Sequence, residues 1–276
     1  MTFATHNSPA RRRANTAKRL NTAMRVLVAL FLLGFSVSAR SENATNAAAL
    51  RAETIFRTRQ QAYQTSPTNT GFAWQFARAC FDWAEFATND KQRAQIAQLG
   101  IKASRELLAR SANSLQGHYY LGLNLGQLAR TKSLGALPIV DEMEIEFKAA
   151  RVLDEKFDFA GPDRTLGLLY FDAPSIGSIG SRSKARTHLQ RAVELAPEFP
   201  ENRLSLAEAL VRWRDLEGAR RELDALEAGL AQAHIQFSGE AWSAAWIDWE
   251  RRLQKLRTRF QATPRPVVTS PKGAAK

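Results

Sequence analysis

The chain has 276 residues, of which 45% are hydrophobic and 24% charged, and its formal net charge is +12. This composition is ordinary for a soluble protein and allows one or two domains. A net charge this positive usually indicates a protein that binds nucleic acid. Residues 1–39, however, hold six basic and no acidic residues, so the remaining 237 residues have a net charge of only +6. No dense basic cluster interleaved with aromatics follows, so we expect no nucleic-acid partner.

Residues 1–39 predict a secretory signal peptide. The basic stretch precedes ten apolar or small residues, "VLVALFLLGF", and Val37 and Ala39 then occupy the −3 and −1 positions of a small-residue cleavage site. Ten apolar residues are too few to span a bilayer, which needs about 20. We therefore expect an exported protein, periplasmic or otherwise extracytoplasmic. Retention of the segment as an uncleaved anchor and a translation start at Met24 stay open.

Cys80 is the only cysteine, which excludes an intrachain disulfide and a cysteine metal site. Its apolar neighbours in "WQFARACFDWAEFA" predict a buried thiol rather than a reactive one. Because no cysteine directly follows the apolar run of the signal peptide, the sequence does not encode a lipoprotein.

Downstream, apolar-periodic segments alternate with Pro, Gly and Asn/Asp clusters, and no stretch shows strand alternation. In chain order this pattern predicts helices over residues 44–63, 70–87, 90–111, 115–131, 138–153, 163–172, 183–196, 201–213, 215–230 and 239–261. Residues 263–276, "TPRPVVTSPKGAAK", are rich in proline and have no core face, so we expect a disordered tail.

Small residues recur at fixed places in these helices. Ala185, Leu189 and Ala192 are spaced by four and three residues, and the same spacing returns 34 residues later at Ala219. The partner helices carry a small residue three positions before a large one, in the pairs Gly122–Leu125, Gly167–Tyr170 and Ala207–Leu210. Small residues let two antiparallel helices approach closely, and so short a unit must stack on its neighbours to bury its apolar face.

The small–large spacing, the 34-residue period and the closing Pro197 resemble the tetratricopeptide repeat signature. The resemblance implies an all-α fold, a tetratricopeptide-like α-solenoid of antiparallel helix pairs. It would occupy residues 40–262 and end in a long C-terminal capping helix.

A narrower resemblance covers roughly residues 45–230. The segments "WQFARA", "YYLGLNLGQLARTKSLGAL" and "DRTLGLLYFDAPSIGSIGSRSKARTHLQRAVELAPEFPENRLSLAEAL" are similar to the periplasmic TRAP-transporter T-component family, the TatT-like proteins. This resemblance implies a scaffold outside the inner membrane that associates with a solute-binding protein and handles a ligand in transit. Such proteins are typically lipoproteins, and this chain departs from them in lacking the cysteine that would be acylated.

No motif indicates catalysis, a cofactor or a metal. The histidines have no second ligand at a metal-binding spacing; they are His6, His118, His188 and His234. The glycines of "PSIGSIGSR" lack the order of a phosphate-binding loop, and the carboxylates of "VDEMEIEF" predict the solvated side of a helix. We find no nucleophile–base pair and expect a protein that is not an enzyme, with an unrecognised periplasmic enzyme as a remaining alternative.

Two surfaces are candidates for binding. Trp242, Trp246 and Trp249 form one apolar stripe with Leu253, Leu256 and Phe260, which predicts either a capping helix or an interface with a partner. The first helix of each repeat lines the inner face of a tetratricopeptide array. On that register the inward residues are Arg78, Tyr119, Arg164, Phe171, Glu208 and Arg212. Aromatic and arginine side chains together would suit an acidic peptide or a carboxylate-bearing ligand.

We therefore expect a non-enzymatic exported scaffold that binds a protein partner through this concave face or through the Trp stripe. The alternative is a TRAP-type transport accessory protein that encloses or passes on a small carboxylate or hydrophobic ligand. The expected partner is extracytoplasmic, with a solute-binding protein as one candidate, and a homo-oligomer stays open.

Overall fold

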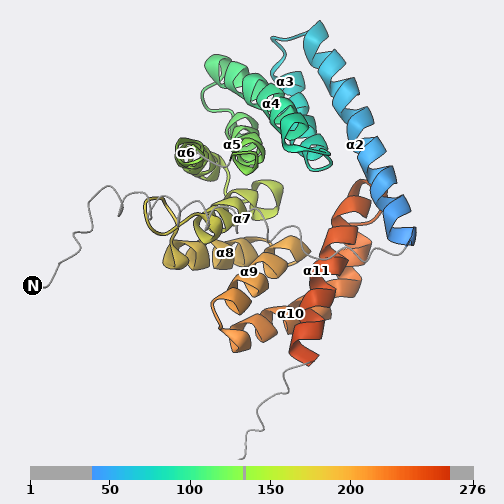
Figure 1. Cartoon of the computed structure of the whole chain (residues 1–276), viewed down its shortest axis with the longest axis vertical. Coiled ribbons are helices and arrows are strands. Elements are labelled where there is room, and N and C mark those ends of the chain that lie inside the picture. Colours follow the sequence, from blue (N-terminus) through green and yellow to red (C-terminus); the bar gives the residue numbers. More distant parts are fainter. Residues whose placement is uncertain (1–38, 133–134, 262–276) are drawn as a thin grey trace, which may run out of the picture. The chain divides into compact units, whose positions relative to one another are not determined.

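The computed structural model describes residues 39–132 and 135–261, and every regular element in these two ranges is a helix (Figure 1). The chain divides into two compact units: unit 1 ends at Pro197 and unit 2 begins at Glu198. The predicted fold class, an all-α solenoid of helix pairs, is confirmed. The placement of one repeat domain over residues 40–262 stays a prediction.

Unit 1 opens with the long helix α2 (Ala39–Thr65) and continues with three helix pairs. The pairs are α3 (Thr70–Ala84) with α4 (Asp90–Arg110), α5 (Leu115–Arg130) with α6 (Leu137–Leu153), and α7 (Phe157–Asp172) with α8 (Arg182–Leu195). The two helices of each pair pack on each other, and α3 also packs on α5. The first helices of the first two pairs therefore lie side by side.

Polar residues fix where several of these helices begin. Asn69, Asn89, Ser114 and Ser181 precede α3, α4, α5 and α8, and the side-chain oxygen of each accepts a hydrogen bond from the backbone N–H three residues on. Such a cap is worth about 1 kcal/mol relative to alanine. The turn-forming residues of the sequence thus define the helix starts directly.

The predicted small residues set the distance between paired helices. A Cβ atom added to Gly122 of α5 would lie 2.5 Å from Cε1 of Phe147 on α6. A Cβ atom added to Gly167 of α7 would lie 2.7 Å from Cγ of Leu189 on α8. Phe147 and Leu189 are buried, so glycine is what allows each large side chain to reach the facing backbone.

Helix α7 starts six residues earlier than expected, with a turn that the sequence pattern does not predict. Asp158, Phe159 and Ala160 have φ angles of 51°, 55° and 61°, so a left-handed turn precedes the right-handed remainder of the helix. Left-handed backbone costs a non-glycine residue about 1–2 kcal/mol. Three such residues in a row persist only where surrounding contacts hold them.

Unit 2 contains the pair α9 (Pro200–Arg212) and α10 (Leu216–Gln236), a short 3₁₀ helix η1 (Glu240–Trp242) and the last helix α11 (Ser243–Gln261). Ala219 and Leu223 of α10 are buried, as the 34-residue period predicts. Helix α11 packs on both α9 and α10. Its buried residues are Trp249, Leu253, Leu256 and Phe260, and the predicted C-terminal capping helix is confirmed.

Two predicted segments fall outside this description. The signal peptide predicted for residues 1–39 lies outside the described residues except at Ala39, and the tail predicted for residues 263–276 lies outside them entirely. Among the helices of residues 39–132 and 135–261, none combines the length and the apolar character needed to cross a bilayer.

Candidate partner-binding face of unit 1

Three of the six predicted inward residues meet around the left-handed turn in unit 1: Arg78, Tyr119 and Arg164. Arg78 interacts electrostatically with both Tyr119 and Asp158, although the three residues come from α3, α5 and α7. Phe171 is partly exposed near the end of α7. The remaining two, Glu208 and Arg212, belong to unit 2.

Tyr119 and Arg164 hold the left-handed turn in place. The Tyr119 hydroxyl donates to Oδ2 of Asp158 at 2.6 Å, and Nη2 of Arg164 donates to the same oxygen at 3.2 Å. Arg164 also donates to the carbonyl oxygens of Phe159 at 3.0 Å and of Asp158 at 3.3 Å. Tyr119 is 1% and Arg164 7% exposed. Both side chains are therefore committed to the turn and lie beneath the surface that it forms.

The electrostatics of the turn keep this arrangement intact at neutral pH. Burial, together with the nearby Asp158 carboxylate, raises the pKa of Tyr119, and the Arg164 charge opposes this only in part. The phenol therefore stays protonated and remains a donor. The left-handed backbone is therefore held by hydrogen bonds from the Tyr119 hydroxyl of α5 and from the Arg164 guanidinium of α7 itself.

The side chains that reach solvent around this turn come mainly from α3. Trp74, Arg78 and Asp82 follow one another at four-residue spacing, which places them on one side of that helix. The Arg78 side chain is 57% and the Asp82 side chain 46% exposed, and Nε of Arg78 lies 3.6 Å from Oδ2 of Asp82. The Trp74 ring stacks on that of Tyr120 with centroids 6.1 Å apart and planes 10° apart.

We call Trp74, Arg78, Asp82, Tyr120 and Asp158 the α3–α5–α7 patch. Of these five, the sequence analysis identified only Arg78. Trp74 and Asp82 could have been found from the same helical register, because they lie four residues on either side of Arg78. Asp158 could not, since its position depends on a left-handed turn.

Asp82 is recessed among its neighbours although its side chain still reaches solvent. Burial raises the pKa of Asp82 to about 6, helped by the charges of Asp158 and Glu85 and opposed by Arg78. One arginine 3.6 Å away therefore compensates this carboxylate only in part. The Asp158 side chain is 37% exposed, and the hydrogen bonds and ion pair given above all use its Oδ2 atom.

In unit 2, the predicted inward residue Glu208 is bound by the chain's own α11. Arg252 donates from Nε to Oε1 of Glu208 at 2.9 Å and from Nη2 to Oε2 at 2.8 Å, while its Nη1 donates to Oε1 of Glu201 at 2.6 Å. The Glu201 and Glu208 charges raise the pKa of Arg252 against the effect of its burial. A fork–fork pair of this kind is among the strongest side-chain contacts in proteins.

The Trp stripe packs onto unit 2 itself. Nε1 of Trp249 donates to Oε2 of Glu201 at 2.7 Å, and Nε1 of Trp246 donates to the Phe237 carbonyl oxygen at 2.6 Å. The Trp242 ring lies edge-to-face against Phe237, with centroids 5.0 Å apart. These contacts account for the stripe as part of a capping helix, and its use as an interface with a partner stays a prediction.

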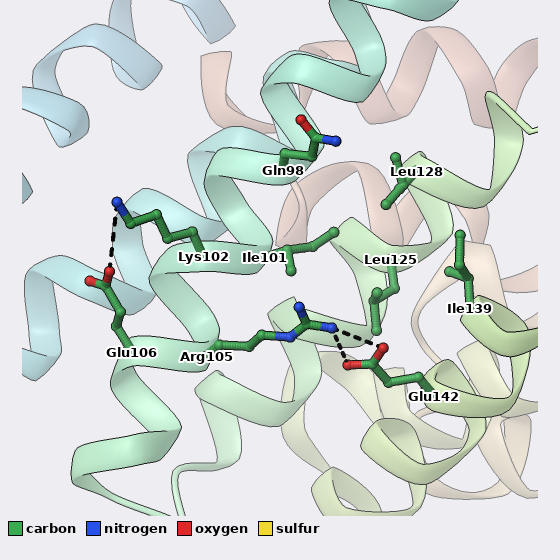
Figure 2. Close-up of a pocket in the computed structure, with 9 residues that line it drawn as sticks. All are labelled: Gln98, Ile101, Lys102, Arg105, Glu106, Leu125, Leu128, Ile139 and Glu142. Carbon is green, nitrogen blue, oxygen red and sulfur yellow. Dashed lines mark hydrogen bonds and ion pairs between the residues drawn. The ribbon is translucent and has the colours of Figure 1, made fainter.

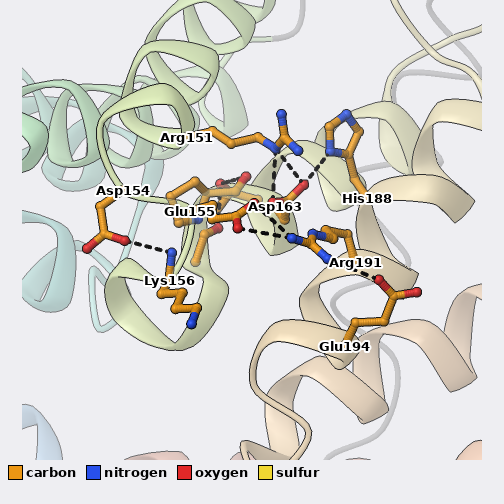
Figure 3. Close-up of polar contacts among 11 residues, drawn as sticks. Arg151, Asp154, Glu155, Lys156, Asp163, His188, Arg191 and Glu194 are labelled. Carbon is orange, nitrogen blue, oxygen red and sulfur yellow. Dashed lines mark hydrogen bonds and ion pairs between the residues drawn. The ribbon is translucent and has the colours of Figure 1, made fainter.

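A polar cluster centred on the buried Asp163 joins the last helices of unit 1 (Figure 3). Asp163 of α7 is fully buried and accepts from Nε of Arg151 at 3.0 Å, and it lies 2.6 Å from Nδ1 of His188 on α8. Arg191 of α8 pairs with Glu155 at 3.0 Å. Because a buried carboxylate needs partners, this cluster fixes the packing of α6, α7 and α8.

A pocket of about 460 Å³ lies on another side of unit 1, between α4, α5 and α6 (Figure 2). Its apolar lining consists of Ile101, Leu125, Leu128 and Ile139. Arg105 on α4 reaches across to Glu142 on α6, with contacts of 2.7 Å and 3.0 Å from Nη2 to the two carboxylate oxygens. The pocket thus combines an apolar floor with two cationic residues, Arg105 and Lys102, each of which is paired with a carboxylate.

Within the part of the chain that the structure describes, no three His, Cys, Asp or Glu residues are grouped as metal ligands would be. Cys80 is buried, and burial raises the pKa of its thiol far above the usual range. Its thiol is accordingly protonated and packed as a small apolar side chain.

Comparison with solved structures shows a tetratricopeptide-type fold. A tetratricopeptide repeat protein of Thermus thermophilus, TTC0263, aligns with a TM-score of 0.53 and 19% sequence identity, covering 86% of this chain and 98% of the other. MamA aligns over 72% of this chain and 98% of the other, with a TM-score of 0.46 and 13% identity. No family model matches the sequence, and no curated protein matches it either.

Proposed function

We propose that this protein is a non-enzymatic, exported helical-repeat scaffold that binds an extracytoplasmic protein partner through the α3–α5–α7 patch. The observation that carries the proposal is the strained turn at Asp158, which is pinned from beneath by Tyr119 and Arg164. Strain of this kind tends to be kept at functional sites, because it must be offset by contacts elsewhere.

The composition of the patch fits recognition rather than chemistry. Trp74 and Arg78 belong to the residue types that dominate binding energy at protein interfaces. The Trp74 ring is already stacked on Tyr120, so little of its side-chain freedom remains to be lost on binding. Two histidine–carboxylate contacts among the described residues of unit 1, His188–Asp163 and His118–Glu146, are both 2.6 Å long, and each joins two helices that pack on each other.

The test is a cross-linking pull-down with the chain from Arg40 onward as bait in extracytoplasmic extract. The double variant Trp74→Ala/Arg78→Ala should lose most of any specifically cross-linked partner, at least about tenfold if both residues are hot spots. Arg59→Ala is the matched control, because Arg59 is an exposed arginine of α2 outside the patch. If the parent chain, the double variant and Arg59→Ala all retain the partner equally, the partner does not bind through the patch.

The second candidate is a TRAP-type transport accessory protein, suggested by the segments that resemble the TatT-like family. The pocket between α4, α5 and α6 supports it, since about 460 Å³ is within the range of small-molecule sites. Arg105 would bind the carboxylate of an amphipathic acid in exchange for Glu142, and the four apolar residues would hold its chain.

Calorimetric titration with octanoate tests this second candidate. The Arg105→Ala variant should bind octanoate at least about tenfold more weakly than the parent chain. Lys91→Ala, an exposed cation at the other end of α4, is the control. Absence of octanoate binding, or binding that is indifferent to Arg105, would count against a carboxylate ligand in this pocket.

A further inference from the structure

The pocket between α4, α5 and α6 has an ion pair at one end and apolar side chains beyond it (Figure 2). Arg105 of α4 points toward α6 and contacts both carboxylate oxygens of Glu142. Lys102 points away from α6, toward Glu106 on its own helix. The polar end of the pocket is therefore one cation and one anion in contact, which together carry no net charge.

This ion pair leaves hydrogen-bonding capacity on both of its residues. The contacts from Arg105 to Glu142 use Nη2 alone, so Nε and Nη1 of Arg105 donate to no residue that the structure describes. Both side chains also reach solvent. Because a guanidinium has five N–H donors and a carboxylate about four acceptor sites, each residue can bind a further group of opposite charge.

A ligand with a single charge fits this end of the pocket poorly. A simple carboxylic acid would gain Arg105, but it would either repel Glu142 or displace it and leave that carboxylate uncompensated. A simple amine would meet the reverse problem at Arg105. A zwitterion avoids both, since its carboxylate lies beside the arginine and its ammonium beside the glutamate, so that opposite charges alternate. An α-amino acid holds both groups on one carbon atom, close enough to face two residues in contact.

The apolar part of the pocket begins one helical turn from the ion pair. Ile101 of α4 and Ile139 of α6 precede the arginine and the glutamate by four and three residues, and Leu125 and Leu128 of α5 complete this lining. Gln98 lines the other end, seven residues before the arginine and therefore about 10 Å from it along α4. The pocket thus has room for a large apolar side chain next to the charged group of a ligand.

We propose that this pocket binds an α-amino acid with a large apolar side chain. The carboxylate of the ligand lies beside Arg105, its ammonium group beside Glu142, and its side chain along the apolar lining. This inference rests on the second candidate function, because it uses the same pocket, and it names the class of ligand. It does not depend on the α3–α5–α7 patch.

The experiment compares three ligands by calorimetric titration at pH 7 and low salt, with the chain from Arg40 onward as receptor. The ligands are 2-aminooctanoate, octanoate, which lacks the ammonium group, and heptylamine, which lacks the carboxylate. The first should bind at least about tenfold more tightly than either of the others. Equal affinities for 2-aminooctanoate and octanoate would overturn the proposal, because the ammonium group would then contribute nothing.

Two variants of α6 locate the ammonium group. Glu142→Gln should weaken binding of 2-aminooctanoate at least about tenfold. The same variant should bind octanoate no more weakly than the parent chain does, because the amide removes a like charge, and this retained binding shows that the variant is folded. Asp141→Asn, at a neighbouring exposed position, should leave both affinities unchanged. Equal affinity of Glu142→Gln and the parent chain for 2-aminooctanoate would contradict the assigned contact.

The outcomes separate this inference from the functions proposed above. If octanoate binds through Arg105 as tightly as 2-aminooctanoate, the inference is wrong and the second candidate stands. If none of the three ligands binds, both are wrong, and the scaffold function is decided independently by the pull-down with Trp74→Ala/Arg78→Ala.

Discussion

Tyr119 of α5 and Asp158 of α7 are joined by a 2.6 Å hydrogen bond between side chains 39 positions apart in the sequence. That bond connects the middle repeat of unit 1 to a turn whose backbone is left-handed at three successive residues. The hydroxyl of Tyr119 is buried, so its removal would leave the strained turn with Arg164 as its remaining side-chain support.

We predict that Tyr119→Phe destabilises unit 1 by about 1–2 kcal/mol, because the Asp158 carboxylate loses one of its two side-chain donors, the other being Arg164. Urea unfolding followed by circular dichroism measures the change. The control is Tyr63→Phe, which removes another tyrosine–carboxylate hydrogen bond of unit 1, to Glu106. Both variants should lose stability, but only Tyr119→Phe should also weaken partner cross-linking. An equal effect on cross-linking would show that the turn does not position the patch.

Replacing either of two glycines by alanine should change the stability of the protein, but in opposite directions. Gly122→Ala forces a methyl group to within 2.5 Å of the Phe147 ring and should cost about 1–3 kcal/mol through overpacking. Gly229 of α10 has open space around it, so Gly229→Ala should gain about 0.5–1 kcal/mol from helix propensity. Thermal melts of the two variants beside the parent chain check both signs. A stabilising Gly122→Ala would contradict the tight packing of α5 on α6.

The raised pKa of Asp82 gives a pH-dependent prediction. Because its folded pKa of about 6 exceeds the unfolded value, the ionised carboxylate destabilises the folded state above pH 6, and this penalty disappears as the pH falls through the unfolded pKa. Asp82→Asn should therefore raise the free energy of unfolding at pH 7, on the order of 1 kcal/mol after allowance for solvent screening of a half-exposed group.

The pH series decides between this cause and a general effect of the substitution. The increase in the free energy of unfolding caused by Asp82→Asn should become smaller as the pH falls from 7 to 4, because the carboxyl group of the parent chain then becomes neutral like the amide. Asp141→Asn, at an exposed position on α6, should show no such trend. A gain that is constant over this range would assign it to something other than the charge of Asp82.

Among the charged side chains of α11, that of Arg252 should contribute most to the stability of unit 2. Arg252→Met leaves Glu201 and Glu208 without their shared partner and should destabilise unit 2 by about 3–5 kcal/mol. Arg251→Met, at the neighbouring and more exposed arginine, should change stability by less than about 1 kcal/mol. Tryptophan fluorescence during denaturation follows mainly unit 2, which holds four of the six tryptophans: Trp213, Trp242, Trp246 and Trp249. Equal midpoints for both variants would contradict the assigned pairing.

The repeat architecture could be predicted because it depends on short-range periodicity. The four–three spacing of Ala185, Leu189 and Ala192 specifies one buried stripe, and all three residues are buried. Gly122 and Gly167 indicate where a helix pair must approach closely, and the structure places a large side chain against each. Such features involve residues within two turns of one another or in adjacent helices.

The candidate site could be predicted only in part, since its geometry depends on distant contacts. Nothing in the local sequence of Asp158 and Phe159 indicates left-handed backbone, which exists because Tyr119 and Arg164 hold it. Glu208 was expected on an open inner face, but Arg252 from 44 positions further along the chain binds its carboxylate. The spacing of residues along a helix predicts in which direction a side chain points, but not which distant residue it contacts.

The pairing of Arg252 with Glu201 and Glu208 also bears on assembly. In a repeat array the last helix pair presents an apolar face on which another repeat could add, and such ends favour head-to-tail association. Here α11 packs on α9 and α10, where the Trp249–Glu201 hydrogen bond and the Arg252–Glu208 pair hold it. Addition of a further repeat to the face of α9 and α10 that α11 covers would therefore first require α11 to detach.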